Sequence, residues 1–133
     1  MSSPSLVLTK DQQQVLNAGF LAEFGRKPER YFSAPGRTEI GGNHTDHQRG
    51  RVLAAAVNLD TRAAVAVNGT REVRILSKGY PLCVVSLDTL VPQQAEINTT
   101  PALVRGVCAR FAQLGCPVEG FDAYCESTVL PGS

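Results

Sequence analysis

The chain has 133 residues, of which 43% are hydrophobic and 19% are charged, and its formal net charge is +1. This composition is typical of one globular domain that is large enough to bury a core. The near-zero charge argues against a nucleic-acid partner, and no apolar run is long enough to span a membrane. The N-terminal residues lack the pattern of a secretory signal, so we expect a cytoplasmic protein.

The four cysteines, at positions 83, 108, 116 and 125, contain no Cys-x-x-Cys pair. This spacing favours neither a zinc site nor a redox couple. Because thiols stay reduced in the cytosol, we expect four free and mostly buried cysteines.

The first element predicted is a helix that follows a flexible tail over residues 1–9. Thr9 and Gln12 have the spacing of a capping box, in which each side chain satisfies a backbone donor of the other residue. Gly25 can adopt the left-handed conformation that ends helices. One apolar stripe follows the helical period and consists of Leu16, Phe20 and Phe24.

A group of strands is predicted next. Residues 31–34 form a short strand that runs into a polar loop, and residues 51–67 form a longer one rich in valine and alanine. Asn68-Gly69 is the strongest short signal for a type I′ hairpin, because both central positions of that turn need a positive φ. Strands over residues 71–77 and 82–87 would then complete an antiparallel meander.

The last two elements predicted are a helix and a strand. Thr100 is a plausible cap, Pro101 suits the first helical turn, and Gly115 ends the helix. Residues 121–130 read as a strand, with Phe121 and its alternate neighbours on one face. The order of helix, strands, helix and strand indicates an α+β domain.

The segment from Ala34 to His47 is the most informative part of the chain. It gathers glycines, an arginine, two histidines and an aspartate without any hydrophobic period. Such a segment is typical of a functional loop. Its glycines at positions 41 and 42 would let the backbone approach a ligand closely.

Three chemistries remain open for this loop. Asn43, His44 and Asp46 offer the donors and acceptors that recognise a polyhydroxylated ligand. Arg37 presents a planar, charged fork that suits a phosphate group. A metal site from His44, Asp46 and His47 is disfavoured, because the two histidines point to opposite faces of an extended segment.

The run Pro35-Gly36-Arg37 followed by Gly42-Asn43-His44-Thr45-Asp46 resembles the signature of galactokinases, which belong to the GHMP family of small-molecule kinases. The resemblance extends over roughly residues 10–133. It implies an α+β fold, the N-terminal part of a GHMP-kinase domain (ribosomal protein S5 domain 2-like), with a mostly antiparallel or mixed sheet and helices on one side.

The resemblance also implies roles for matched residues. Arg37 is similar to the family arginine near the transferring phosphoryl group, which makes it the catalytic candidate. Asn43, His44 and Asp46 match positions that hold the sugar. Asn43 stands where most members have glutamate, and His47 replaces the usual tyrosine.

In the family, a glycine-rich loop that cradles the phosphates of ATP follows the strand predicted at residues 121–130. The catalytic aspartate and a second domain lie further along. The resemblance therefore implies that residues 10–133 are a truncated N-terminal domain. MgATP would be the co-substrate of the full-length enzyme, while this chain would hold no cofactor, no metal and no useful kinase activity.

The function that the resemblance implies is phosphorylation of galactose by ATP to galactose 1-phosphate. Two alternatives remain open: a non-catalytic galactose sensor derived from a galactokinase, and a kinase for another sugar such as N-acetylgalactosamine. We expect galactose and, in the full-length enzyme, ATP as partners. Exposed apolar faces and strand edges also predict self-association of the fragment.

Overall fold

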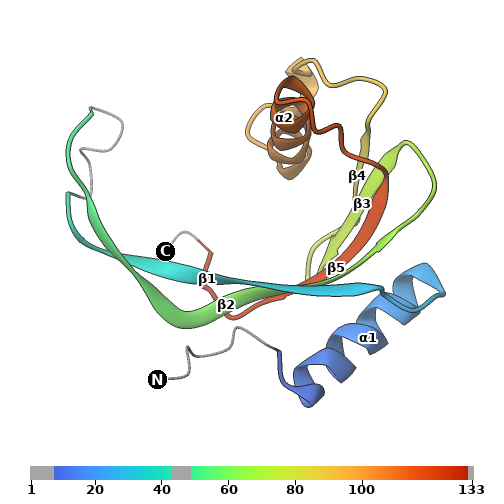
Figure 1. Cartoon of the computed structure of the whole chain (residues 1–133), viewed down its shortest axis with the longest axis horizontal. Helices are drawn as coiled ribbons and strands as arrows, with labels where there is room; N and C mark the ends of the chain where they lie inside the picture. The colour runs from blue at the N-terminus through green and yellow to red at the C-terminus, as the bar shows by residue number, and fades with distance from the viewer. Residues whose placement is uncertain (1–7, 43–48, 132–133) are drawn as a thin grey trace.

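The computed structural model describes residues 8–42 and 49–131 of the chain. Within these residues, two α-helices and one short 3-10 helix accompany a five-stranded sheet (Figure 1). The predicted α+β class is confirmed. The elements in chain order are α1 (Lys10–Phe24), β1 (Arg30–Gly41), β2 (Leu53–Val67), β3 (Glu72–Ser77), β4 (Cys83–Ser86), η2 (Gln94–Glu96), α2 (Thr100–Gln113) and β5 (Phe121–Ser127).

Helix α1 follows the pattern predicted for it. The Thr9 side chain accepts a hydrogen bond from the backbone N–H of Gln12 at 3.2 Å, and the Gln12 side chain accepts one from the backbone N–H of Thr9 at 2.9 Å. The helix ends at Gly25, whose φ is 69°. Leu16 and Phe20 of its apolar stripe are fully buried, so the stripe forms the contact with the sheet.

The strand order differs from the predicted meander. The order is β1-β2-β5-β3-β4, so β5 lies between β2 and β3. It runs antiparallel to β2 and parallel to β3. Strands β3 and β4 form an antiparallel pair, as predicted. The prediction of a hairpin between β2 and β3 is wrong.

The turn at Asn68-Gly69 explains this difference. Asn68 does not adopt the positive φ that a type I′ turn requires. Its side-chain amide donates a hydrogen bond to Asp122 of β5 at 2.9 Å, and its side-chain oxygen accepts one from the backbone N–H of Thr70 at 2.9 Å. The turn therefore directs the chain away from β2 and leaves the neighbouring place to β5.

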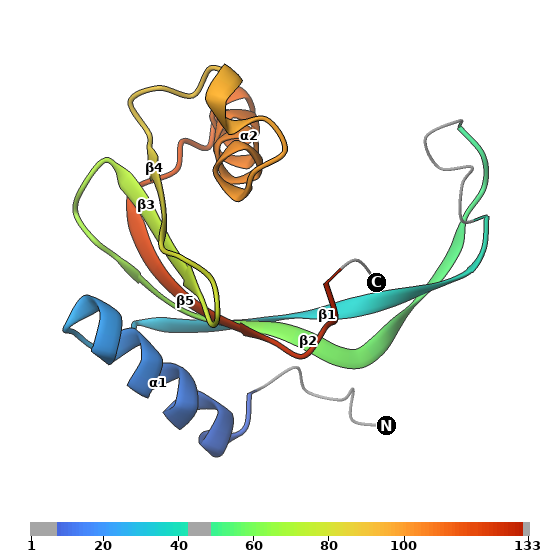
Figure 2. The same ribbon diagram turned by 180° about the vertical axis from the view of Figure 1, so that it is seen from behind.

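The two α-helices pack on opposite faces of the sheet, which corrects the expectation that they share one side (Figure 2). Helix α1 covers a cluster that includes Ala64, Ala66 and Tyr124. Helix α2 covers the other cluster, which includes Val73, Val85, Cys108 and Phe121. Because alternate residues of a strand point to opposite faces, the central strand β5 needs cover on both sides.

A buried carboxylate, Asp122, ties α1 to the sheet. Arg74 donates hydrogen bonds to both of its oxygens at 2.7 Å, and Arg26 and Asn68 each donate one at 2.9 Å. Burial raises the pKa of Asp122, but these hydrogen bonds outweigh burial and hold its pKa below the ordinary value. The two guanidinium groups also lie over aromatic rings of α1, those of Phe20 and Phe24.

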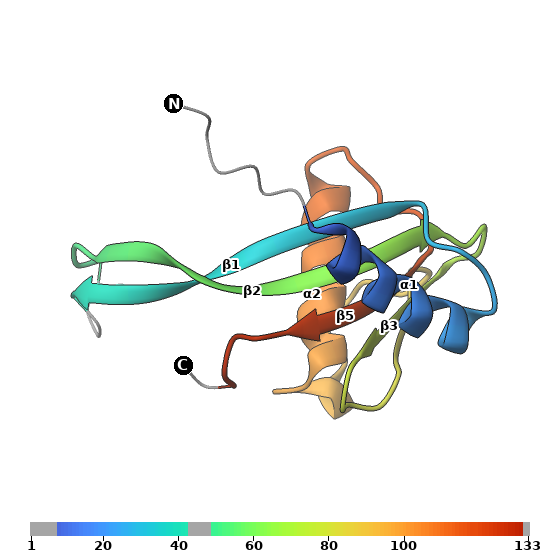
Figure 3. The ribbon, with the colours of Figure 1, turned by 90° about the horizontal axis from the view of Figure 1, so that it is seen from below.

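Strands β1 and β2 extend beyond the rest of the sheet as a two-stranded arm (Figure 3). Strand β5 pairs with β2 only over Thr61–Val67, whereas β1 pairs with β2 as far as Gly41 opposite Leu53. The arm carries Arg37 and leads into residues 43–48. The described part of this arm lies away from both α-helices (Figure 3).

Helix α2 begins one residue earlier than predicted. Its N-cap residue is Thr99 rather than Thr100, and the Thr99 side chain makes no capping hydrogen bond. Pro101 lies in the first turn, as predicted. The apolar face of α2 is only partly covered, because about half or more of the side-chain surface remains exposed at Leu103, Val107, Phe111 and Leu114.

The four cysteines are unpaired, but only one of them, Cys108, is buried. The expectation of mostly buried thiols is therefore wrong. Burial raises the pKa of Cys83, Cys108 and Cys125. These three thiols are accordingly protonated at neutral pH.

Candidate sugar and nucleotide sites

The polar segment predicted as a loop is a strand over most of its length. Residues 34–41 belong to β1 and pair with β2 except at Gly36 and Ile40. The register shifts where Pro35 pairs with Asp60 and Arg37 pairs with Ala56. Proline and glycine therefore produce an irregularity inside the strand rather than its end, because β1 has a single long partner that can bulge around them.

The glycines of this segment have different surroundings. A Cβ atom at Gly36 would lie 3.0 Å from the side chain of Val129, and one at Gly42 would lie 2.3 Å from the carbonyl oxygen of Arg51. Gly42 also has a φ of 85°, which disfavours other residues. At Gly41 a Cβ would meet no atom within 4 Å. Close packing of the protein itself thus explains Gly36 and Gly42 without a ligand.

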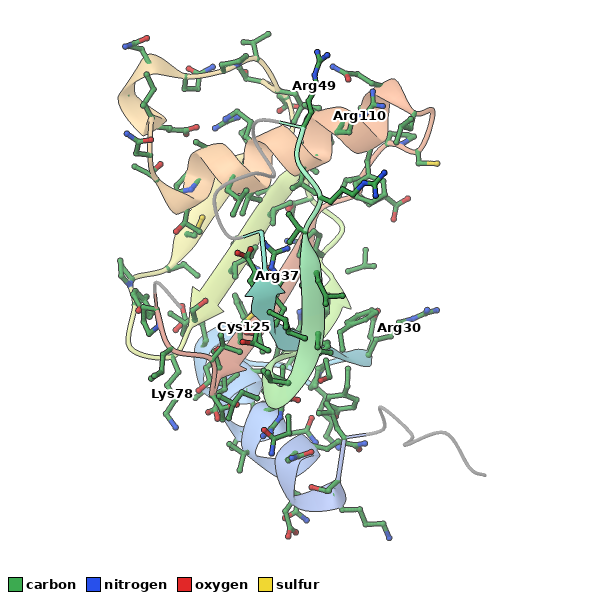
Figure 4. The ribbon with its side chains drawn as sticks, turned by 90° about the vertical axis from the view of Figure 1, so that its left-hand side faces the viewer. Arg30, Arg37, Arg49, Lys78, Arg110 and Cys125 are labelled. Atoms are coloured by element: carbon green, nitrogen blue, oxygen red, sulfur yellow. The ribbon has the colours of Figure 1, made fainter. Side chains whose placement is uncertain are left out.

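Arg37 lies on the arm with its side chain 69% exposed (Figure 4). Its Nη2 atom donates a hydrogen bond to Oε1 of Glu39 at 3.2 Å. The two residues alternate along β1 and so share a face of the strand. An ion pair with this exposure contributes little stability, which leaves the guanidinium free to bind an anion.

The remaining predicted site residues lie outside the residues that the structure describes: Asn43, His44 and Asp46, together with His47 of the metal alternative. Gly41 pairs with Leu53 at the end of the arm, and this is the last described strand pair before the segment. Arg37 is the predicted site residue that the structure places. Within residues 8–42 and 49–131, no group of three histidine, cysteine or acidic residues could hold a metal ion.

A hollow that the sequence did not predict lies beside the end of β5. Its volume is about 700 Å³, and a second hollow of about 390 Å³ shares part of its wall. Insertion of β5 beside β3 brings the walls together, so no local sequence pattern could have indicated the hollow. Its lining includes Thr61, Ile75, Ser77, Tyr80, Leu82, Cys83, Asn98, Thr99, Ser127 and Val129.

The hollow combines apolar walls with a polar rim. The hydroxyl groups of Thr61 and Ser127 lie 2.8 Å apart, and Ser127 Oγ accepts the backbone N–H of Val129 at 3.1 Å. Lys78 lies nearby, in a 3.3 Å ion pair with Glu126 (Figure 4). Apolar walls with a few placed polar groups are typical of sites for small organic ligands. A heterocycle with polar edges would suit this lining.

Comparison with known proteins shows that the chain is similar to galactokinases. A family model described as the galactokinase galactose-binding signature matches residues 18–67, which include Arg37 and residues 43–48. The galactokinase of Streptococcus mutans is 30% identical over 126 residues, which are 92% of this chain and 32% of that protein.

Solved structures share the fold. The chain matches a Lactococcus lactis galactokinase, crystallised in complex with galactose, with a TM-score of 0.75 and 22% identity over 89% of this chain and 31% of that one. It also matches the Methanococcus jannaschii mevalonate kinase with a TM-score of 0.59 and 12% identity, over 77% of this chain and 33% of that one.

The chain spans about a third of the length of the galactokinases that it matches. The galactose-binding signature lies on α1, β1 and β2, and the likeness in fold extends over nearly all of the chain. No helix among the described residues is long and apolar enough to cross a membrane. Signature, sequence and fold agree: the chain carries the galactokinase galactose-binding signature, is similar in sequence to galactokinases over about 90% of its length, and shares its fold with a galactokinase and a mevalonate kinase.

Proposed function

We propose that this chain is the sugar-binding part of a galactokinase, an enzyme that transfers the γ-phosphoryl group of MgATP to the anomeric hydroxyl of galactose. The observation that carries the proposal is the galactose-binding signature over residues 18–67. Arg37 of the motif lies on the arm of β1 and β2, away from the two described α-helices, where a ligand could reach it (Figure 3). The similarity to galactokinases over about 90% of the chain supports the same reaction.

Arg37 is the catalytic residue of the proposed site. Its exposed guanidinium would offset the negative charge that develops on phosphate oxygens in the transition state. The resemblance assigns sugar binding to Asn43, His44 and Asp46. An ionised aspartate accepts hydrogen bonds from hydroxyl groups, and the asparagine amide can hold a hydroxyl without adding charge.

The hollow beside β5 is our candidate for the nucleoside of ATP. In the family, the glycine-rich phosphate loop follows the strand that corresponds to β5, and the hollow adjoins residues 127–131 at that end. Its apolar walls and hydroxyl rim suit a base and a ribose. A phosphate loop works through many backbone N–H groups and a helix N-terminus, which residues up to 131 do not supply.

We infer from this that the 133-residue chain has no useful kinase activity. A coupled assay with galactose and ATP should give no turnover above the rate without enzyme. Turnover that disappears in an Arg37→Met variant would contradict this inference. We also infer a cytoplasmic location, since the four unpaired thiols suit a reducing compartment.

Calorimetry with galactose tests the sugar assignment. The chain should release heat with galactose, and Asp46→Asn should abolish the signal because an amide cannot replace a carboxylate that accepts from two hydroxyls. Arg110→Ala, on the exposed surface of α2, is the matched control and should bind normally. A folded Asp46→Asn variant that binds galactose as tightly as the unmodified chain would refute the assigned role.

A kinase for another sugar is the alternative that the sequence itself favours, because Asn43 replaces the usual glutamate. The same calorimetry with N-acetylgalactosamine separates the two sugars. Tighter binding of N-acetylgalactosamine than of galactose would defeat the galactose assignment. A catalytically silent sugar sensor would bind galactose too, so only activity of a longer chain distinguishes it from the enzyme.

A further inference from the structure

A buried arginine on α2 fastens the segment that precedes the helix. Arg105 is only 7% exposed, and its Nε and Nη2 atoms donate to the two carboxylate oxygens of Glu96 at 2.9 and 2.8 Å. Its Nη1 atom donates to the carbonyl oxygens of Ser86, at 3.1 Å, and Thr89. One guanidinium therefore joins the end of β4, the connection after it and η2 to α2.

Glu96 continues this connection to the wall of the hollow. Its carbonyl oxygen accepts the backbone N–H of Thr99 at 3.0 Å and also the Thr99 hydroxyl. Thr99 lines the hollow, as do its neighbours Asn98, Thr100 and Pro101. Arg105 itself does not line the hollow, so it would act on this wall through Glu96.

The segment between β4 and α2 has little other order to hold it. Over residues 87–99 its regular structure is the three residues of η2. The backbone hydrogen bonds around η2 are local, such as Glu96 N–H to Gln93 and Ile97 N–H to Gln94. Contacts of Leu87 and Leu90 with the α2 cluster add apolar packing. Among the described side chains of α2, Arg105 makes the hydrogen bonds to this segment.

We propose that Arg105 is a positioning residue for the nucleotide hollow: through Glu96 it fixes the wall formed by residues 98–101 against β3, β4 and β5. The proposal rests on the proposed function only for the identity of the ligand. A lysine cannot replace this arrangement, because a single ammonium group lacks the planar fork that binds a carboxylate and two carbonyls together.

Cys83 provides a reporter inside the hollow. It lines the hollow and is half-buried, and burial together with the charge of Glu96 raises the pKa of its thiol. Movement of the 98–101 wall would expose this thiol and remove the nearby carboxylate. Both changes increase the thiolate fraction and the rate of alkylation. Cys108 and Cys125 lie outside this lining and report on general loosening.

The test measures iodoacetamide labelling of each cysteine by peptide mass spectrometry in the complete chain. Arg105→Lys should label Cys83 about tenfold faster than the unmodified chain does, as a local opening of the wall, with Cys108 and Cys125 unchanged. Glu96→Gln, which keeps the size of the side chain, should change the Cys83 rate in the same direction. Arg110→Lys, on the same helix, should leave every rate unchanged.

Two results would overturn the proposal. One is an unchanged Cys83 rate in both Arg105→Lys and Glu96→Gln. The other is a uniform rise at Cys83, Cys108 and Cys125, which would give Arg105 a general stabilising role only. The labelling uses no nucleotide, so it does not depend on the ATP assignment. That assignment fails separately if ATP does not slow the labelling of Cys83 in a longer chain that has kinase activity.

Discussion

The two faces of the sheet differ in how completely the chain covers them. On the α1 face, Leu16 and Phe20 are fully buried, and Asp122 is closed off by two arginines. On the α2 face, Leu103 and Phe111 keep 70% and 49% of their surface exposed. Within the described residues, the α1 face is therefore a closed core, whereas the α2 face is an apolar surface that is covered only in part.

The exposed apolar surface on the α2 face forms a groove. It has a volume of about 480 Å³ and lies between α2 and the sheet. Apolar side chains line it, namely Ile75, Leu103, Val104, Val107, Phe111, Val118 and Phe121, together with Cys108. Longer galactokinases contain about twice as much additional chain as the part that matches here. This contrast indicates that packing on the α1 face contributes more to the stability of the chain than packing on the α2 face does.

The largest difference should come from removing an aromatic ring on each face. Phe20→Ala leaves a cavity in the closed core and should lower the free energy of unfolding by about 4 kcal/mol. Phe111→Ala, on the half-exposed face of α2, should cost about 1 kcal/mol, because less surface is buried there. Urea denaturation of both variants measures the ratio. Equal losses would show that the faces are equally well packed.

Asp122 should give the next largest effect. Asp122→Asn leaves Arg74 and Arg26 without their shared carboxylate and should cost about 3 kcal/mol. The matched control is Asp88→Asn, which removes an exposed ion pair with Arg71 and should cost less than about 0.5 kcal/mol. Thermal denaturation compares them. A loss at Asp122 no larger than that at Asp88 would mean that the buried network does not stabilise α1.

Acid should sharpen the same comparison. The pKa of Asp122 is lowered in the folded chain, so its stabilising contribution is present above the unfolded-state pKa of about 3.9 and is lost as pH falls through the folded-state pKa. The stability difference between the unmodified chain and Asp122→Asn should therefore shrink below about pH 4. Urea midpoints measured from pH 6 downward test this. A constant difference would contradict a lowered pKa.

Matched glycines on the two helices should shift stability in opposite directions. A Cβ at Gly19 of α1 would lie 2.2 Å from the ring of Tyr124, so Gly19→Ala should cost about 2 kcal/mol. At Gly106 of α2 a Cβ would meet no atom within 4 Å, so Gly106→Ala should add about 1 kcal/mol through helix propensity. The melting temperatures of both variants, compared with that of the unmodified chain, test this prediction. The same sign for both would refute the difference in packing.

The smallest effect on stability, but a clear one on association, should come from a charge on the open face. Val107→Glu places a carboxylate in the apolar groove and should reduce self-association while changing the unfolding free energy by less than about 1 kcal/mol. Sedimentation velocity measures the shift toward monomer. Gln14→Glu on the exposed surface of α1 is the charge-matched control. A chain that is already monomeric would contradict the predicted association.

Local signals predicted most elements correctly. The capping box at Thr9 and Gln12, the stripe through Leu16 and Phe20, and the alternation in residues 121–127 all act between near neighbours. The predictions were wrong where residues that are far apart in the sequence determine the local structure. Asn68 bonds to Asp122, 54 positions away, and the segment containing Arg37 continues as a strand because β2 extends far enough to pair with it.

The candidate sites divide in the same way. The run from Pro35 to Asp46 carries its resemblance in consecutive residues, so the sequence alone indicated a sugar kinase and named Arg37, Asn43, His44 and Asp46. The hollow beside β5 and the role of Arg105 had no such signal. Their walls come from segments that meet only after β5 has entered the sheet.

By itself the sequence determined most of the secondary structure and the α+β class and indicated the likeness to galactokinases, because helix caps, apolar periods and a contiguous motif depend on residues close in the chain. Tertiary structure alone decided the strand order, the placement of the helices on opposite faces and the position of the hollow beside β5. These depend on which distant strand occupies the place beside β2, a choice made by the burial of both faces of β5 and by the hydrogen bonds to Asp122.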